Sequence, residues 1–210
     1  MKNTGILTFI IALMVLSCSR PTFKAKWTTE TAPDVFTARF ETSKGNFDVE
    51  IHRAWSPKAA DRFYQLVRHH FYDNMLFYRV VPNFVVQFGN SDTATFKHWE
   101  KYKVPDEEVI KSNLKGTMSF ARDGKETRGN DLFINLQDNV RLDTIMYNGV
   151  RGFPVFGVVT KGMDVVESIY SGYGDETMSK LDTLYLNRAH FLKTFPKLDS
   201  IKKAFILTTE

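Results

Sequence analysis

The sequence predicts a mainly β domain, in which eight antiparallel strands form a closed barrel capped by two α-helices. Three observations support this fold class. The apolar residues form about eight short runs of strand length. Only two segments show clear helical periodicity, and the chain has no internal repeat. Many short strands with few helices favour an antiparallel sheet that closes on itself.

The composition fits one globular domain behind a leader. The chain has 210 residues, of which 43% are hydrophobic and 25% are charged, so it is too apolar for a disordered protein. Its 18 phenylalanines predict a large aromatic core. The net charge is +4, and the basic residues are scattered rather than gathered in a stripe. We therefore expect no nucleic-acid partner.

Residues 1–17 have the features of a secretory signal peptide. Lys2 supplies a positive charge, and the apolar stretch 6–16 is too short for a bilayer span, which needs about 20 apolar residues. Cys18, the single cysteine of the chain, follows directly. Its surroundings resemble the lipobox of bacterial lipoproteins, which implies that Cys18 is lipidated and holds the protein at a membrane. An ordinary signal peptide that ends near a cysteine is the alternative.

Residues 18–34 join this cysteine to the folded part. The range holds two prolines and four threonines without clear periodicity, so we expect a flexible tether. The folded domain is expected over 35–210. By analogy with lipoproteins, Ser19 after the cysteine favours the outer membrane of a bacterial cell envelope over the inner membrane.

The domain is predicted to begin with a hairpin and a helix. Apolar and polar residues alternate on both sides of Gly45, which predicts two paired strands. Ser56 and Pro57 then form a helix start, with Ser56 as the N-cap. Apolar residues recur at helical spacing as far as Val67, and the cationic residues 68–70 suit a helix C-terminus.

The later elements follow from shorter signals. A second helix is expected over 163–170, after Gly162, and a last strand over 204–208. Short apolar runs predict five more strands, over 76–81, 84–88, 117–121, 132–136 and 155–159.

The segment 77–89 is the most informative part of the chain. In a regular strand, Phe77 and Arg79 point to one face and Tyr78 to the other. Arginine is almost never fully buried unless it is paired. Arg79 is therefore either solvated on the outer face of the barrel or held in a site, and the pattern alone favours the outer face.

Segment 77–89 resembles the signature of the cyclophilin-type peptidyl-prolyl isomerases, F-x-R-V-x-P-x-F-x-x-Q-x-G. Three further stretches resemble the family in the same order, namely 116–121, 131–136, and 141–143 together with 153–157. The resemblance implies that Arg79 is the catalytic residue. It also implies a proline pocket lined by Phe84, Phe133 and Leu142, within a substrate-binding set of Phe84, Gln87, Ala121, Asp131, Phe133, Leu142 and Phe153.

The resemblance also implies a function. We expect a peptidyl-prolyl cis-trans isomerase that assists the folding of exported envelope proteins, with proline-containing polypeptides as partners, no cofactor, no metal and a monomeric state. The alternative is a proline-binding chaperone or interaction module with weak or no catalysis; a structural envelope protein is a third possibility. Departures from the family at Arg122, Asp131 and Phe153 motivate the second hypothesis. Arg122 and Arg141 could favour acidic substrates, and the connection between Leu142 and Phe153 is longer than usual.

No metal site is indicated by the sequence. The five histidines lack ligand spacing. The acidic run Asp106-Glu107-Glu108 follows Pro105 and predicts a loop or a capping feature.

Overall fold

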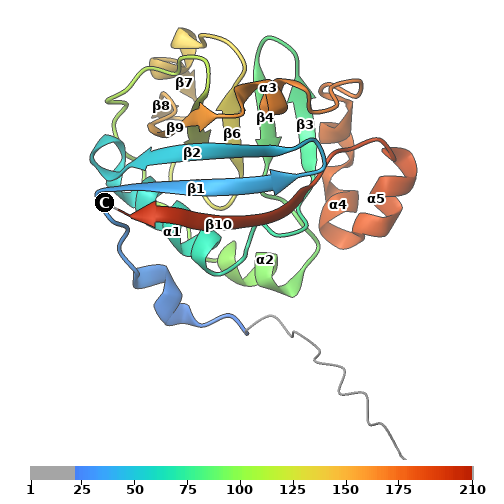
Figure 1. Cartoon of the computed structure of the whole chain (residues 1–210), viewed down its shortest axis with the longest axis horizontal. Coiled ribbons are helices and arrows are strands. Elements are labelled where there is room, and N and C mark those ends of the chain that lie inside the picture. Colours follow the sequence, from blue (N-terminus) through green and yellow to red (C-terminus); the bar gives the residue numbers. More distant parts are fainter. Residues whose placement is uncertain (1–21, 210) are drawn as a thin grey trace, which may run out of the picture.

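The computed structural model describes residues 22–209, so the predicted signal peptide and Cys18 lie outside the described residues. One eight-stranded antiparallel sheet dominates the fold, in the order β10-β1-β2-β9-β5-β6-β4-β3, and β7 and β8 form a separate two-stranded sheet (Figure 1). The strands are β1 (Val35–Thr42), β2 (Asn46–His52), β3 (Phe77–Val81), β4 (Val85–Phe88), β5 (Thr117–Phe120), β6 (Leu132–Asn135), β7 (Met146–Tyr147), β8 (Val150–Arg151), β9 (Val155–Lys161) and β10 (Ile201–Thr209).

The main sheet confirms the predicted mainly β, eight-stranded antiparallel class, but not the closed barrel. Its edge strands, β3 and β10, meet at one isolated bridge between Leu76 and Ser200. Two backbone hydrogen bonds flank this bridge, from Phe77 N to the carbonyl of Asp199 at 3.0 Å and from Ile201 N to the carbonyl of Met75 at 2.7 Å. Because no continuous ladder joins β3 to β10, the sheet is an open half-barrel.

The helices agree with the prediction only in part. The first predicted helix is α1 (Pro57–Arg68), whereas the second, α3 (Met163–Glu167), ends earlier than expected. The described residues contain three further α-helices, so the prediction of two helices is wrong: α2 (Ala94–Trp99), α4 (Leu181–Leu186) and α5 (Arg188–Thr194). Each is too short to show a helical period. Side-chain caps begin α2 and α5, since Thr93 accepts from Phe96 N at 3.2 Å and Asn187 from His190 N at 3.0 Å.

Figure 1 shows α1 and α2 beyond the β10 edge of the sheet, with α4 and α5 beside one end of it. Phenylalanines fill the main core, as the composition suggests. The rings of Phe40 and Phe47 stack with centroids 4.8 Å apart, and Phe63 and Phe156 lie 5.5 Å apart. All four are fully buried, and each such side chain contributes about 1.5–3 kcal/mol to folding.

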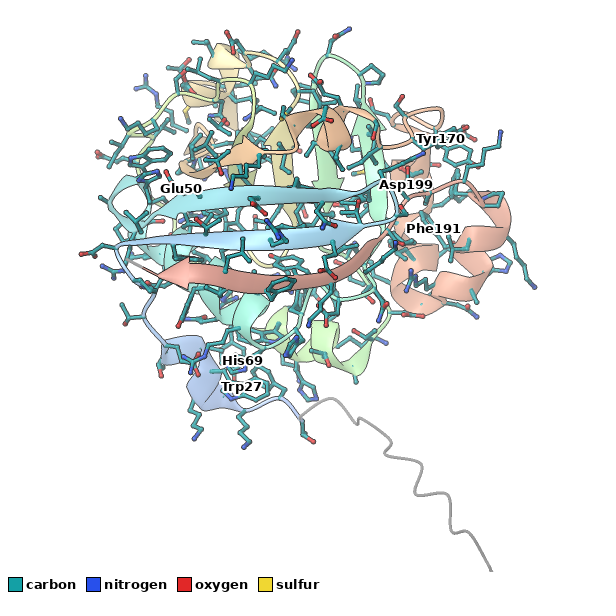
Figure 2. All side chains as sticks on the ribbon, in the orientation of Figure 1. Trp27, Glu50, His69, Tyr170, Phe191 and Asp199 are labelled. Carbon is teal, nitrogen blue, oxygen red and sulfur yellow. The ribbon has the colours of Figure 1, made fainter. Side chains whose placement is uncertain are left out.

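The described part of the expected tether packs against the domain. A short 3₁₀ helix (Ala25–Thr29) places Trp27 in the main core at 6% exposure. The Trp27 ring stacks on the His69 ring with centroids 3.9 Å apart, and the two side chains lie together below α1 in Figure 2. His69 also bonds to the carboxylate of Glu30 at 3.0 Å. Around Trp27 the chain is therefore not the flexible linker that we expected.

The acidic run after Pro105 serves as a cap. The carboxylate of Glu107 accepts from Lys58 N at 2.8 Å and from Ala59 N at 3.2 Å, in the first turn of α1. It also pairs with the buried Arg128 at 3.0 Å. This agrees with the capping interpretation. Within residues 22–209, no group of three or more His, Cys, Asp or Glu side chains is placed to hold a metal ion.

Candidate active site

A β-bulge in β3 decides where the side chains around Arg79 point. The register between β3 and β4 shifts between Phe77 and Arg79, so that Tyr78 is an extra residue on β3. As a result Phe77 and Val80 both lie in the main core, although strict alternation would put them on opposite faces. Our expectation that Phe77 and Arg79 share a face is therefore wrong. The bulge turns Arg79 away from the core.

Two partners hold the guanidinium of Arg79. Its Nη1 donates to Oε1 of Gln87 at 3.0 Å, and Gln87 is also the residue opposite it on β4. Its Nε donates to Oδ1 of Asp175 at 2.6 Å, in an ion pair whose arginine side chain is 21% exposed. A bridge between Val80 and Gly174 brings the loop of Asp175 to the side of β3. Arg79 is thus held in a site and is not simply solvated.

A small apolar cluster, separate from the main core, lies in the same cavity as Arg79. The cavity has a volume of about 510 Å³, and Arg79 and Gln87 line it together with the cluster. An apolar cavity with a few convergent polar groups is the usual form of a ligand site. The cluster consists of buried Val85, Phe133 and Leu142 with partly buried Phe84, Ala121 and Phe153.

Aromatic rings form the walls of this cavity, and two cationic side chains lie over one of these rings, that of Phe84. The rings of Phe133 and Phe153 meet edge to face, with centroids 5.7 Å apart. Two guanidinium groups lie over the Phe84 ring, that of Arg79 at 5.6 Å and that of Arg141 at 5.0 Å from its centroid. Arg141 is exposed, on a 3₁₀ helix (Val140–Asp143), and therefore remains accessible to a ligand.

Buried asparagines fix the two phenylalanines on which the cavity depends. Asn139 donates from Nδ2 to the carbonyl of Phe84 at 2.9 Å and to Oδ1 of Asn135 at 2.8 Å. Asn113 donates to the carbonyl of Phe153 at 2.9 Å. Asn113 and Asn135 are fully buried and Asn139 is 3% exposed. Because satisfied buried polar networks are rigid, these backbone positions are set before a ligand binds.

Arg122 lines the cavity with a buried guanidinium that is held by other residues. Its side chain is fully buried and pairs with Asp106 at 3.0 Å, while Nη2 donates to the carbonyl of Arg151 at 3.0 Å. Its guanidinium lies 5.0 Å from the centroid of the Phe153 ring. Burial lowers the pKa of Arg122, and the ion pair with Asp106 opposes that shift. The ion pair with Asp106 offsets the charge that Arg122 presents to the cavity, and the expectation that Arg122 and Arg141 favour acidic substrates stays a prediction.

The cavity also has a polar part, which contains Asp131. The hydroxyl of Tyr78 donates to Oδ1 of Asp131 at 2.9 Å. Burial raises the pKa of Asp131 to about 7; the bond from Tyr78 opposes this shift, Asp123 and Glu100 add to it, and Lys103 reduces it. Asp131 therefore changes charge near neutral pH, unlike an ordinary aspartate.

Eight residues that the sequence assigned to the site lie within the described range, and the structure brings all of them to one cavity. The roles assigned to these residues remain predictions. The residues are Arg79, Phe84, Gln87, Ala121, Asp131, Phe133, Leu142 and Phe153.

Sequence reasoning missed two contacts in the site. Asp175 bonds to a residue 96 positions earlier, and it lies directly before a short 3₁₀ helix (Glu176–Lys180) that the sequence did not predict. The sequence assigns no site role to Tyr78, yet its hydroxyl donates to the carboxylate of Asp131. No local signal marks either contact, because one depends on a bulge and the other on a distant loop.

The titration of Asp131 gives a pH-dependent stability. Since its pKa is raised to about 7 by burial, the folded protein binds this proton more tightly than the unfolded chain, and stability falls as pH rises from about 4 to about 7. Asp131→Asn removes this effect and keeps an acceptor for Tyr78. Urea unfolding at pH 5 and pH 8 measures the free energy of unfolding of the variant and of the wild type. Relative to the wild type, the variant should be more stable at pH 8 than at pH 5 by about 2 kcal/mol. An equal difference at both pH values would contradict the shifted pKa.

Comparisons with known proteins agree with this geometry. Residues 37–190 match the family model described as cyclophilin type peptidyl-prolyl cis-trans isomerase. The chain is 36% identical over 142 residues to a peptidyl-prolyl cis-trans isomerase of Arabidopsis thaliana. This match covers 65% of this chain and 82% of that protein. It is 32% identical over 168 residues to peptidyl-prolyl cis-trans isomerase A of Dickeya dadantii, covering 78% of this chain and 83% of that protein.

A solved structure shares the fold. The crystal structure of a Cryptosporidium parvum cyclophilin type peptidyl-prolyl cis-trans isomerase superposes with a TM-score of 0.60, covering 84% of this chain and 99% of that one at 19% identity. The matched family model spans most of the chain and includes every site residue from Arg79 to Phe153. The chain therefore belongs to the family of cyclophilin-type peptidyl-prolyl cis-trans isomerases.

Proposed function

We propose that this domain isomerises prolyl peptide bonds in exported polypeptides and that Arg79 is the catalytic group. One observation carries the proposal. Arg79 is held by Gln87 and Asp175 at a cavity whose other wall is the separate apolar cluster around Phe133. A guanidinium beside an apolar cavity suits a ligand that has an apolar ring next to an amide group.

The chemistry concerns one bond rotation. Amide resonance resists rotation of the C–N bond with a barrier of about 18–20 kcal/mol. A donor that binds the prolyl nitrogen as it loses conjugation, or the adjoining carbonyl oxygen, lowers this barrier. The guanidinium of Arg79 has five N–H groups and a permanent charge, and its bonds to Gln87 and Asp175 leave further N–H groups for such an amide.

The apolar cluster and Gln87 supply the rest of the site. Phe84, Phe133 and Leu142 hold the proline ring, because transfer of an apolar ring out of water is favourable. Gln87 binds the peptide backbone near the rotating bond. The proposed site is preorganised by the buried asparagines, so that the twisted amide is bound more tightly than either planar isomer. This difference in binding is the source of the rate enhancement.

We further propose that the protein works at the bacterial envelope as a lipoprotein. The apolar leader, with Cys18 directly behind it, supports export and lipidation, and Ser19 supports the outer membrane. A lipid anchor of several acyl chains gives firm attachment, since each buried methylene contributes about 0.8 kcal/mol. In the described part of the chain, no helix has the length and hydropathy to cross a bilayer. Exported proteins are fitting substrates, because uncatalysed prolyl isomerisation takes tens to hundreds of seconds.

The Arg79→Ala variant tests the catalytic proposal. Loss of the charged donor should lower kcat/KM about 10²- to 10³-fold, the usual effect of removing a preorganised electrostatic donor. The fold should persist, because Arg79 lies outside the core clusters. Exchange NMR on an Ala-Pro peptide measures turnover, and circular dichroism checks the fold.

Arg68→Ala, at an exposed arginine of α1 that does not line the cavity, is the matched control and should keep wild-type turnover. Unchanged turnover in Arg79→Ala would remove this arginine from the mechanism. Peptide binding by the wild type without any acceleration would favour the interaction module instead.

Cys18→Ala tests the anchor. In a bacterial host that processes lipoproteins, the wild-type full-length chain should sediment with membranes after a carbonate wash and carry the mass of its acyl chains. The variant should lose the acyl mass and most of the membrane-bound fraction, whereas Ser19→Ala should retain both. A Cys18→Ala protein that sediments like the wild type would count against lipidation.

A further inference from the structure

The segment between Leu142 and Phe153 forms a defined hairpin beside the cavity. Its strands, β7 and β8, are joined by Asn148 and Gly149, which have φ values of 45° and 81°. Positive φ at both central residues is the requirement of the tight turn that Asn-Gly favours in two-residue hairpins. The extra length of this connection is therefore ordered by its own sequence.

Hydrogen bonds fix this hairpin to the walls of the cavity. Asn148 donates from Nδ2 to the carbonyl of Asp123 at 2.7 Å. The buried Arg122 donates to the carbonyl of Arg151 at 3.0 Å. At the base of the hairpin, Ile145 N donates to the carbonyl of Arg141 at 3.1 Å. These bonds tie the hairpin to the loop after β5 and to the 3₁₀ helix that carries Leu142.

The hairpin exposes apolar side chains toward that cavity. Ile145 is 36% exposed, Tyr147 is 40% exposed and Met146 is 65% exposed. Ile145 and Tyr147 line the cavity of about 510 Å³, whereas Met146 is not among its lining residues. The Tyr147 ring lies 6.0 Å from the Phe153 ring, so aromatic surface runs from the apolar cluster onto the hairpin.

We propose that Ile145 and Tyr147 bind a large apolar side chain next to the proline of the bound polypeptide. Because both side chains are partly exposed within the cavity, they offer apolar contact area to a ligand that enters it. The surface continues that of the apolar cluster, and Arg122, whose guanidinium lies over the Phe153 ring, is paired with Asp106. The occupant is therefore an uncharged, apolar group that enters with the proline. This inference rests on the proposed function and adds a sequence preference to it.

A peptide series tests this preference with the full-length protein in detergent. Each peptide carries either Phe or Ala at the position directly before the proline or at the position directly after it. Exchange NMR gives kcat/KM for every peptide. The variants are the double replacement of Ile145→Ser with Tyr147→Ser and the control Met146→Ser, which changes an exposed residue of the same hairpin outside the cavity.

We expect the wild type and Met146→Ser to prefer Phe at one position about tenfold or more, the usual range for an apolar contact. The double variant should lose this preference, so that its ratio of kcat/KM for the Phe peptide to kcat/KM for the Ala peptide falls to about one. Equal rates with Phe and Ala in the wild type, or a preference retained by the double variant, would overturn this inference alone. No acceleration of any peptide would overturn the proposed function and this inference with it. Self-association of the wild type that the double variant loses would assign the surface to a second copy instead.

Discussion

The bulge at Tyr78 fixes the direction of the Arg79 guanidinium, and the organisation of the site depends on it. A regular strand would send Arg79 to the same face as Phe77, which lies in the core. The extra residue places Arg79 opposite Gln87 and within reach of Asp175, while Tyr78 reaches Asp131. A single irregularity of β3 therefore orders both the cationic and the acidic groups of the cavity.

The apolar half of the site is built independently of the main core. Phe133 and Leu142 form their own cluster, and the amides of Asn113 and Asn139 tie the backbone beside it. The phenylalanine-rich core supports the sheet, and this small cluster remains open toward the cavity. Such a division lets the site expose apolar surface while the rest of the domain buries it.

Much of this arrangement is readable from the sequence, and the reasons for the failures are physical. The alternation around Gly45 and the helix start at Pro57 are local signals, and β1, β2 and α1 follow them. The signature brings Arg79 and Gln87 into one short segment, and in the structure the two side chains form a hydrogen bond. Other features depend on residues distant in the chain: the contact of Asp175, and the half-barrel whose edges meet near Ser200. The six- and seven-residue helices are shorter than two turns and show no period.

A structure of the domain with a bound Ala-Pro peptide tests the central claim most directly. We expect the proline ring among Phe84, Phe133 and Leu142, with a guanidinium nitrogen of Arg79 about 2.7–3.2 Å from the prolyl carbonyl oxygen or facing the prolyl nitrogen. A proline ring bound elsewhere, or an Arg79 side chain turned into bulk solvent in the complex, would contradict the account.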